Sequence, residues 1–153
     1  MTLWAPARSP QGFRELWCQE LTSLAELAKL RARLRTSLTG SATVLHPDRE
    51  HWSERLVLIT DELTSNALRH GGGPVATALC RTGNEWLVSV SDRSPEVPPI
   101  PAKGRDPALG GHGLYLIAQL SVRHGWFPHR GTKTVWAVVA AEGPAPVARP
   151  TRE

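Results

Sequence analysis

One stretch decides the fold of this chain: Leu56-Val-Leu-Ile-Thr-Asp-Glu-Leu-Thr-Ser-Asn-Ala-Leu-Arg-His-Gly-Gly-Gly73. At about 100° per residue, four apolar side chains form one helical stripe, which consists of Leu56, Ile59, Leu63 and Ala67. Along the edge of this stripe, Glu62, Asn66 and His70 follow each other at intervals of four residues. A carboxylate and an amide stacked in this way can share a magnesium ion or orient one water or hydroxyl group. The alternative is that these polar residues only mark the solvent boundary of the helix.

Length and composition indicate one globular domain. The chain has 153 residues, of which 41% are hydrophobic and 21% are charged, and these values are ordinary for a globular protein. We expect the domain to span 22–141, between an N-terminal tail at 1–21 and a disordered C-terminal tail at 142–153. No apolar run reaches the roughly eighteen residues of a membrane span, and the first residues lack a secretory pattern. The sequence therefore predicts a cytoplasmic protein that does not enter a membrane.

The net charge of +4 raises the possibility of a nucleic-acid partner. The basic residues concentrate in Lys29-Leu-Arg-Ala-Arg-Leu-Arg35, where they alternate with apolar residues. In a helix this run forms a solvated face above an apolar one. No aromatic platform accompanies it. We therefore expect no direct contact with nucleic acid, and an acidic protein partner is the next alternative.

The pattern of apolar residues and turn signals predicts an α/β fold. Two helices come first, one over Thr22–Leu38 and one from an N-cap at Asp48 to Arg69. Two hairpins follow, separated by a loop from Asp92 to Gly113 and a short helix at Leu114–Leu120. Their strands are predicted at Val75–Arg81, Trp86–Ser91, Ser121–Phe127 and Thr134–Ala140. Mostly antiparallel strands with helices on one face form a two-layer α/β sandwich.

Two further segments carry residues that could bind a nucleotide. The strand Val88-Ser-Val-Ser-Asp92 ends in an aspartate, which can accept a hydrogen bond from an exocyclic amine such as that of adenine. The glycines of Gly110-Gly-His-Gly113 run directly into a helix, where backbone N–H groups and the helix dipole favour a phosphate. A turn residue and a flexible hinge are the alternative interpretations of these segments. The sequence contains neither a P-loop nor Gly-x-Gly-x-x-Gly.

In order and spacing, the three segments resemble the N, G1 and G2 boxes of the GHKL superfamily, which binds ATP in the Bergerat fold. Asp61-Glu-Leu-Thr-Ser-Asn-Ala-Leu-Arg-His-Gly71 is most similar to the anti-sigma factor serine kinases. Gly131-Thr-Lys-Thr-Val-Trp136 looks like a motif of their short actinobacterial relatives. The resemblance covers about Leu24 to Ala140, which is nearly the whole predicted domain.

The resemblance implies ATP and Mg²⁺ as cofactors and assigns roles to single residues. Asn66 would ligate Mg²⁺ through its amide oxygen, a hard ligand that suits this ion. Glu62 would be the general base that takes the proton from an attacking serine hydroxyl. Asp92 would bind the amino group of adenine, helped by Thr134 on the last strand.

The phosphates would be bound by the backbone of three residues: Gly111, Gly113 and Leu114. The chain departs from the usual Asp-x-Gly-x-Gly of the G1 box, because it reads Asp92-Arg-Ser94-Pro95. Ser94 takes the place of the first glycine and counts among the expected nucleotide-binding residues. An Asp-x-Ser-Pro sequence is common in the short relatives.

The partners implied by the resemblance are an anti-anti-sigma protein of the STAS type, with the serine that accepts the phosphate, and a sigma factor. A homodimer is also possible by resemblance. Two alternatives stay open: a partner-binding regulator of the same fold that transfers no phosphate, and a detached histidine-kinase catalytic domain.

Overall fold

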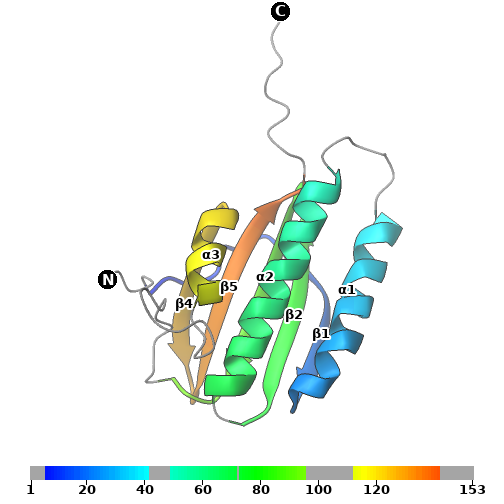
Figure 1. The fold of residues 1–153 in the computed structure, drawn as a ribbon. Helices are drawn as coiled ribbons and strands as arrows, with labels where there is room; N and C mark the ends of the chain where they lie inside the picture. The colour runs from blue at the N-terminus through cyan, green and yellow to red at the C-terminus, as the bar shows by residue number, and fades with distance from the viewer. Residues whose placement is uncertain (1–5, 42–48, 72, 96–111, 142–153) are drawn as a thin grey trace, which may run out of the picture.

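The structure is a computed structural model that describes residues 6–41, 49–71, 73–95 and 112–141. In these ranges the chain has an α/β fold with five strands, three α-helices and one short 3-10 helix (Figure 1). The elements in chain order are β1 (Arg14–Leu21), η1 (Leu24–Glu26), α1 (Leu27–Ser41), α2 (Arg49–His70), β2 (Val75–Thr82), β3 (Glu85–Asp92), α3 (His112–Leu120), β4 (Arg123–His129) and β5 (Thr132–Ala140).

The order of strands in the sheet brings distant parts of the chain together. The sheet runs β1-β2-β3-β5-β4, and every neighbouring pair of strands is antiparallel. Strand β5 lies between β3 and β4, so the two hairpins are joined along β3 and β5. In this pairing Asp92, the last residue of β3, lies opposite Lys133 near the start of β5. The predicted antiparallel sheet is confirmed.

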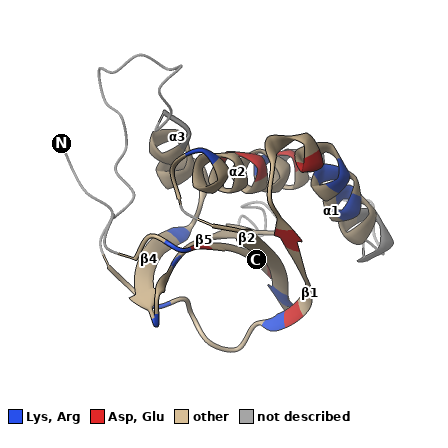
Figure 2. Ribbon diagram, turned by 90° about the horizontal axis from the view of Figure 1, so that it is seen from below, with Lys and Arg blue, Asp and Glu red and all other residues tan. Residues whose placement is uncertain are grey.

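All three α-helices cover the same face of the sheet, with α2 between α1 and α3 (Figures 1 and 2). The predicted stripe of α2 faces the sheet, and none of its four apolar side chains is more than 7% exposed. These side chains share one core cluster with residues of β3 and β5, which include Val88, Val90, Val135, Ala137 and Val139. Burial of this stripe is what fixes α2 above the middle of the sheet.

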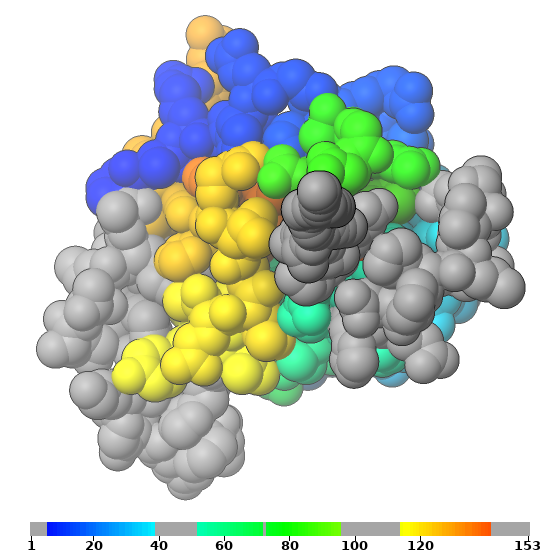
Figure 3. Space-filling model, turned by 90° about the horizontal axis from the view of Figure 1, so that it is seen from above, coloured from blue at the N-terminus to red at the C-terminus, as the bar shows by residue number. Residues whose placement is uncertain are grey.

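Residues 6–13, which precede β1, cross the other face of the sheet (Figure 2). The backbone N–H of Ala7 donates to the carbonyl of Trp126 at 2.8 Å, and the carbonyl of Ala7 accepts from Nε1 of Trp136 at 2.8 Å. Figure 2 shows this segment arching below the sheet, and Figure 3 shows it in blue along one side of the molecule. Beneath it lies a small apolar cluster that consists of Leu87, Trp136 and Val138.

Residues 14–21 of the predicted N-terminal tail over 1–21 form strand β1 and belong to the sheet, so the prediction is wrong for this part. Its residues pair with β2 along one edge of the sheet, with an irregularity between Glu15 and Trp17. Of the eight residues in β1, only Leu21 is buried, and most of the others are exposed. An edge strand of this kind lacks a clear alternation of apolar and polar residues, so it is specified mainly by its pairing with β2.

The first predicted helix, Thr22–Leu38, is divided into η1 and α1 and continues to Ser41. The carboxylate of Glu26 accepts hydrogen bonds from the backbone N–H groups of Thr22 and Ser23, at 2.7 and 3.1 Å. These residues therefore form a capping turn, and the α-helix itself begins only at Leu27.

The other predicted helices and strands are confirmed to within two residues at either end. Asp48, the loop residues 96–111 and the tail at 142–153 lie outside the described residues. A helix of sufficient length and apolar character to cross a membrane is absent from the described ranges.

Candidate functional site

Helix α2 presents polar side chains at the edge of its buried stripe. Half-buried Asn66 and exposed His70 both line a small hollow next to the C-terminal half of the helix. Glu62 is also half-buried, but it lies one helical turn before Asn66 and does not line the hollow. The four-residue spacing seen in the sequence thus brings the amide and the imidazole to one place and keeps the carboxylate a turn away.

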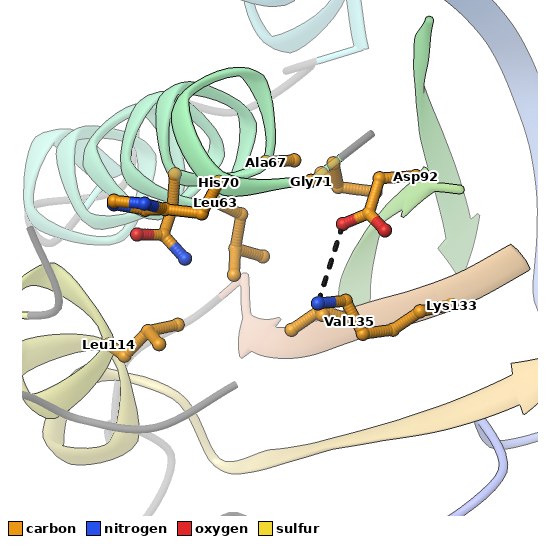
Figure 4. A pocket seen from close by; sticks show the side chains of 10 residues that line it. Leu63, Ala67, His70, Gly71, Asp92, Leu114, Lys133 and Val135 are labelled. Carbon is orange, nitrogen blue, oxygen red and sulfur yellow. Dashed lines mark ion pairs between the residues drawn. The ribbon is translucent and has the colours of Figure 1, made fainter. Parts of the chain in front are cut away.

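The hollow lies between α2, α3 and the neighbouring strands β3 and β5 (Figure 4). Three residues to which the resemblance assigns nucleotide binding line it, namely Asn66, Asp92 and Leu114. The complete lining is Leu63, Asn66, Ala67, His70, Gly71, Val90, Asp92, Leu114, Lys133 and Val135. Its enclosed volume is about 20 Å³, which is room for one water molecule.

Asp92 is the buried acid of the hollow, with an exposed fraction of only 3%. Its Oδ1 accepts a hydrogen bond from the backbone N–H of Ser94 at 2.8 Å, and its Oδ2 lies 3.6 Å from Nζ of Lys133. Burial raises the pKa of this carboxyl above its ordinary value, while the Ser94 N–H and the Lys133 ammonium oppose that rise. Ser94 therefore contributes through its backbone, which orients the carboxylate of Asp92.

Lys133 is the residue of the hollow that the sequence analysis missed. Its side chain is 8% exposed and extends from β5 towards Asp92, as the dashed line in Figure 4 marks. A signal for this position was present in the sequence. Lys133 shares its parity along the strand with Val135, Ala137 and Val139, and in a strand every second side chain points to the same face. This parity places the lysine on the helix-covered face.

Glu62 has an environment that suits a base. Burial raises the pKa of its carboxyl above the ordinary value of 4.5, the neighbouring charge of Asp61 raises it further, and Arg69 partly opposes the rise. A carboxylate with a raised pKa takes up a proton more readily than an ordinary one.

Thr134 does not lie where the sequence analysis expected it. Its neighbours Lys133 and Val135 line the hollow, so the side chain of Thr134 points to the opposite face of the sheet. There the hydroxyl oxygens of Thr134 and Ser91 are 2.7 Å apart and share a hydrogen bond. Thr134 therefore does not help Asp92 directly.

The phosphate-binding residues of the prediction are only partly described. Leu114 is buried in α3 at 3% exposure and lines the hollow. Gly113 belongs to the first turn of α3, and Gly111 lies outside the described residues.

The polar groups of the hollow have the chemistry to bind a nucleotide, but the enclosed space is small. A carboxylate can accept from an exocyclic amine, and an amide oxygen is a hard ligand of the kind that Mg²⁺ prefers. In the described part of the chain, no three His, Cys, Asp or Glu side chains converge on a metal site. Mg²⁺ usually takes only one or two protein ligands besides phosphates and water, so Asn66 fits that role.

Comparisons with known proteins do not identify the chain. No family profile matches it, and no curated protein matches it significantly. The residues around the hollow and the motifs of the sequence are therefore what carries the assignment of a function.

Proposed function

We propose that this protein is an ATP-binding anti-sigma regulatory factor with the Bergerat fold of the GHKL superfamily. It binds Mg-ATP at the hollow between α2, β3 and β5 and transfers the γ-phosphate to a serine of an anti-anti-sigma protein of the STAS type. The new phosphoserine introduces negative charge at the contact between the two proteins and separates them. The kinase is then free to hold a sigma factor.

One observation carries this assignment: Asn66, Asp92 and Leu114 come from three different elements and line the same hollow. Burial of an amide and a carboxylate beside an apolar core costs free energy, because polar groups lose hydration there. Packing alone therefore does not explain why these residues are present. Their chemistry suits the two ends of Mg-ATP, with Asp92 for the adenine amine and Asn66 for the metal that accompanies the phosphates. The resemblance of the segments that carry these residues to the N, G1 and G2 boxes also supports the proposal.

Glu62 completes the proposed chemistry as the general base. Its raised pKa favours proton uptake from a serine hydroxyl, and its place one turn from Asn66 suits a base that acts next to the metal-bound phosphates.

A second candidate function is a regulator of the same fold that binds its partner without phosphate transfer. The observation in its favour is the small volume of the hollow, in which Lys133 already faces the carboxylate of Asp92. Phosphate transfer from ATP to a serine of a partner protein separates this candidate from the kinase.

Calorimetric titration with ATP, with and without Mg²⁺, tests the proposal. We expect magnesium-dependent binding by the wild type and a loss of affinity of about tenfold or more in Asp92→Ala, because a hydrogen bond to a charged group is removed. Glu85→Ala is the matched control, since Glu85 begins the same strand and forms only a surface ion pair with Arg123. Absence of ATP binding at millimolar concentration would overturn the proposal.

A further inference from the structure

Asp92 and Lys133 form an ion pair that is unusual for its burial. Their side chains are 3% and 8% exposed, whereas each partner in the other two ion pairs of the described ranges is at least 24% exposed. The register of β3 and β5 places the two residues directly opposite each other. The backbone of the sheet therefore imposes this pairing.

The surroundings of Asp92 determine which carboxylate oxygen a ligand could reach. Oδ1 already accepts the backbone N–H of Ser94 at 2.8 Å. Gly71, at the end of α2, borders the same carboxylate so closely that a Cβ there would lie 2.5 Å from Oδ2. Oδ2 remains for a ligand in the hollow, and Nζ of Lys133 faces this atom at 3.6 Å. An amine that enters the hollow therefore meets Nζ of Lys133 beside the oxygen that it would bind.

The size of the hollow also indicates a role for Lys133. The enclosed part of the hollow, about 20 Å³, holds a water molecule, so a base that reaches Asp92 meets the side chains that line this space. Most of the other lining groups are apolar side chains packed in the core, whereas a lysine has a flexible four-carbon stem. Lys133 is the lining side chain next to Asp92 that can withdraw without unpacking the apolar core.

We propose that Lys133 is an internal competitor of the nucleotide base and keeps the hollow closed until a base displaces it from Asp92. This inference rests on the proposed nucleotide function and adds a determinant of affinity to it. When the neutral amine of a base takes the place of the Lys133 ammonium, Asp92 exchanges an ion pair for a single hydrogen bond. This exchange is unfavourable by itself. The apparent affinity is then reduced by the small fraction of molecules in which Lys133 has withdrawn.

The test compares Lys133→Ala and Lys133→Arg with the wild type by titration with adenosine and with Mg-ATP. Adenosine carries no phosphate, so a change in its affinity reports on the base alone. We expect Lys133→Ala to bind both ligands about tenfold or more tightly than the wild type, and Lys133→Arg to remain close to the wild type. Lys29→Ala, on the exposed side of α1, controls for the loss of one positive charge, and thermal unfolding shows that each variant is folded.

The outcomes separate the inference from the function on which it rests. Tighter binding of both ligands by Lys133→Ala than by the wild type supports the competitor role. Unchanged or weaker adenosine binding by Lys133→Ala, with binding by the wild type intact, overturns the competitor role and leaves the nucleotide function in place. Weaker Mg-ATP binding with unchanged adenosine binding has the same consequence, because Lys133 then acts on the phosphates. If no variant binds either ligand, the proposed function fails, and the competitor role fails with it.

Discussion

Gly71 lies so close to Asp92 that any side chain at position 71 would overlap with the carboxylate. A Cβ built on Gly71 would be 2.6 Å from Cβ and 2.5 Å from Oδ2 of Asp92. The first residue after α2 and the last residue of β3 are therefore matched in shape, and the missing side chain of one makes room for the buried acid of the other. This contact links the end of α2 to the end of β3.

Substitution of this glycine should affect both stability and the site. We expect Gly71→Ala to lower the free energy of unfolding by about 1–3 kcal/mol through overpacking and to displace the Asp92 carboxylate. Urea unfolding measures the first effect, and ATP titration measures the second. Gly83→Ala in the exposed turn between β2 and β3 is the control, because no heavy atom lies within 4 Å of a Cβ there. Equal stability of the two variants would contradict the overlap.

Glu62→Gln tests the proposed base. We expect loss of phosphate transfer with ATP affinity preserved, because the amide cannot accept a proton but has nearly the same shape. Transfer of labelled phosphate to a STAS-type partner measures the activity, and Glu54→Gln, at an exposed position of the same helix, should retain it. Transfer by Glu62→Gln at the rate of the wild type would exclude Glu62 as the base.

The raised pKa of Glu62 also predicts how stability depends on pH. The folded protein holds the proton of this carboxyl more tightly than the unfolded chain, so the unfolded state binds fewer protons in the interval between 4.5 and the raised value. Stability from this group is therefore fully present below that interval and is lost as the pH rises through it. We expect Glu62→Gln to gain stability relative to the wild type from acidic to neutral pH, as measured by denaturant unfolding at several pH values. A difference in stability that is independent of pH would contradict the burial of this group.

The ion pair between Arg31 and Asp61 predicts a small and salt-dependent effect. Its N–O distance is 2.7 Å and it joins α1 to α2, but the side chains are 37% and 29% exposed. Solvent therefore screens the pair, and we expect a coupling energy of about 1 kcal/mol or less. A double-mutant cycle with Arg31→Ala and Asp61→Ala measures it, and the coupling should decrease at high salt.

The segment before β1 should depend on Trp136. We expect Trp136→Phe to lower the free energy of unfolding by about 0.5–1.5 kcal/mol, because an aromatic ring remains while the hydrogen bond to the Ala7 carbonyl is lost. Hydrogen exchange at the Ala7 amide, which donates to Trp126, should become faster. Protection at Ala7 equal to that of the wild type would show that the segment is held without the indole.

The sequence by itself determined the parts of the fold that depend on local pattern. The stripe of α2 has the helical period, and its burial was predictable because the apolar residues repeat every three to four positions. The β2–β3 hairpin was predictable from Thr82-Gly83-Asn84 between two apolar runs. Asp92 was a candidate because it ends such a run.

Only the tertiary structure decided which of these residues meet and which face away. Strand β1 has no clear alternation, and it exists because β2 offers it hydrogen bonds along an edge. Thr134 and Lys133 are adjacent in sequence, but their side chains point to opposite faces of the sheet. The register of β5 against β3 then places Lys133 beside Asp92. Register and strand order depend on contacts between residues about forty positions apart, and a local pattern of charge and hydropathy does not contain that information.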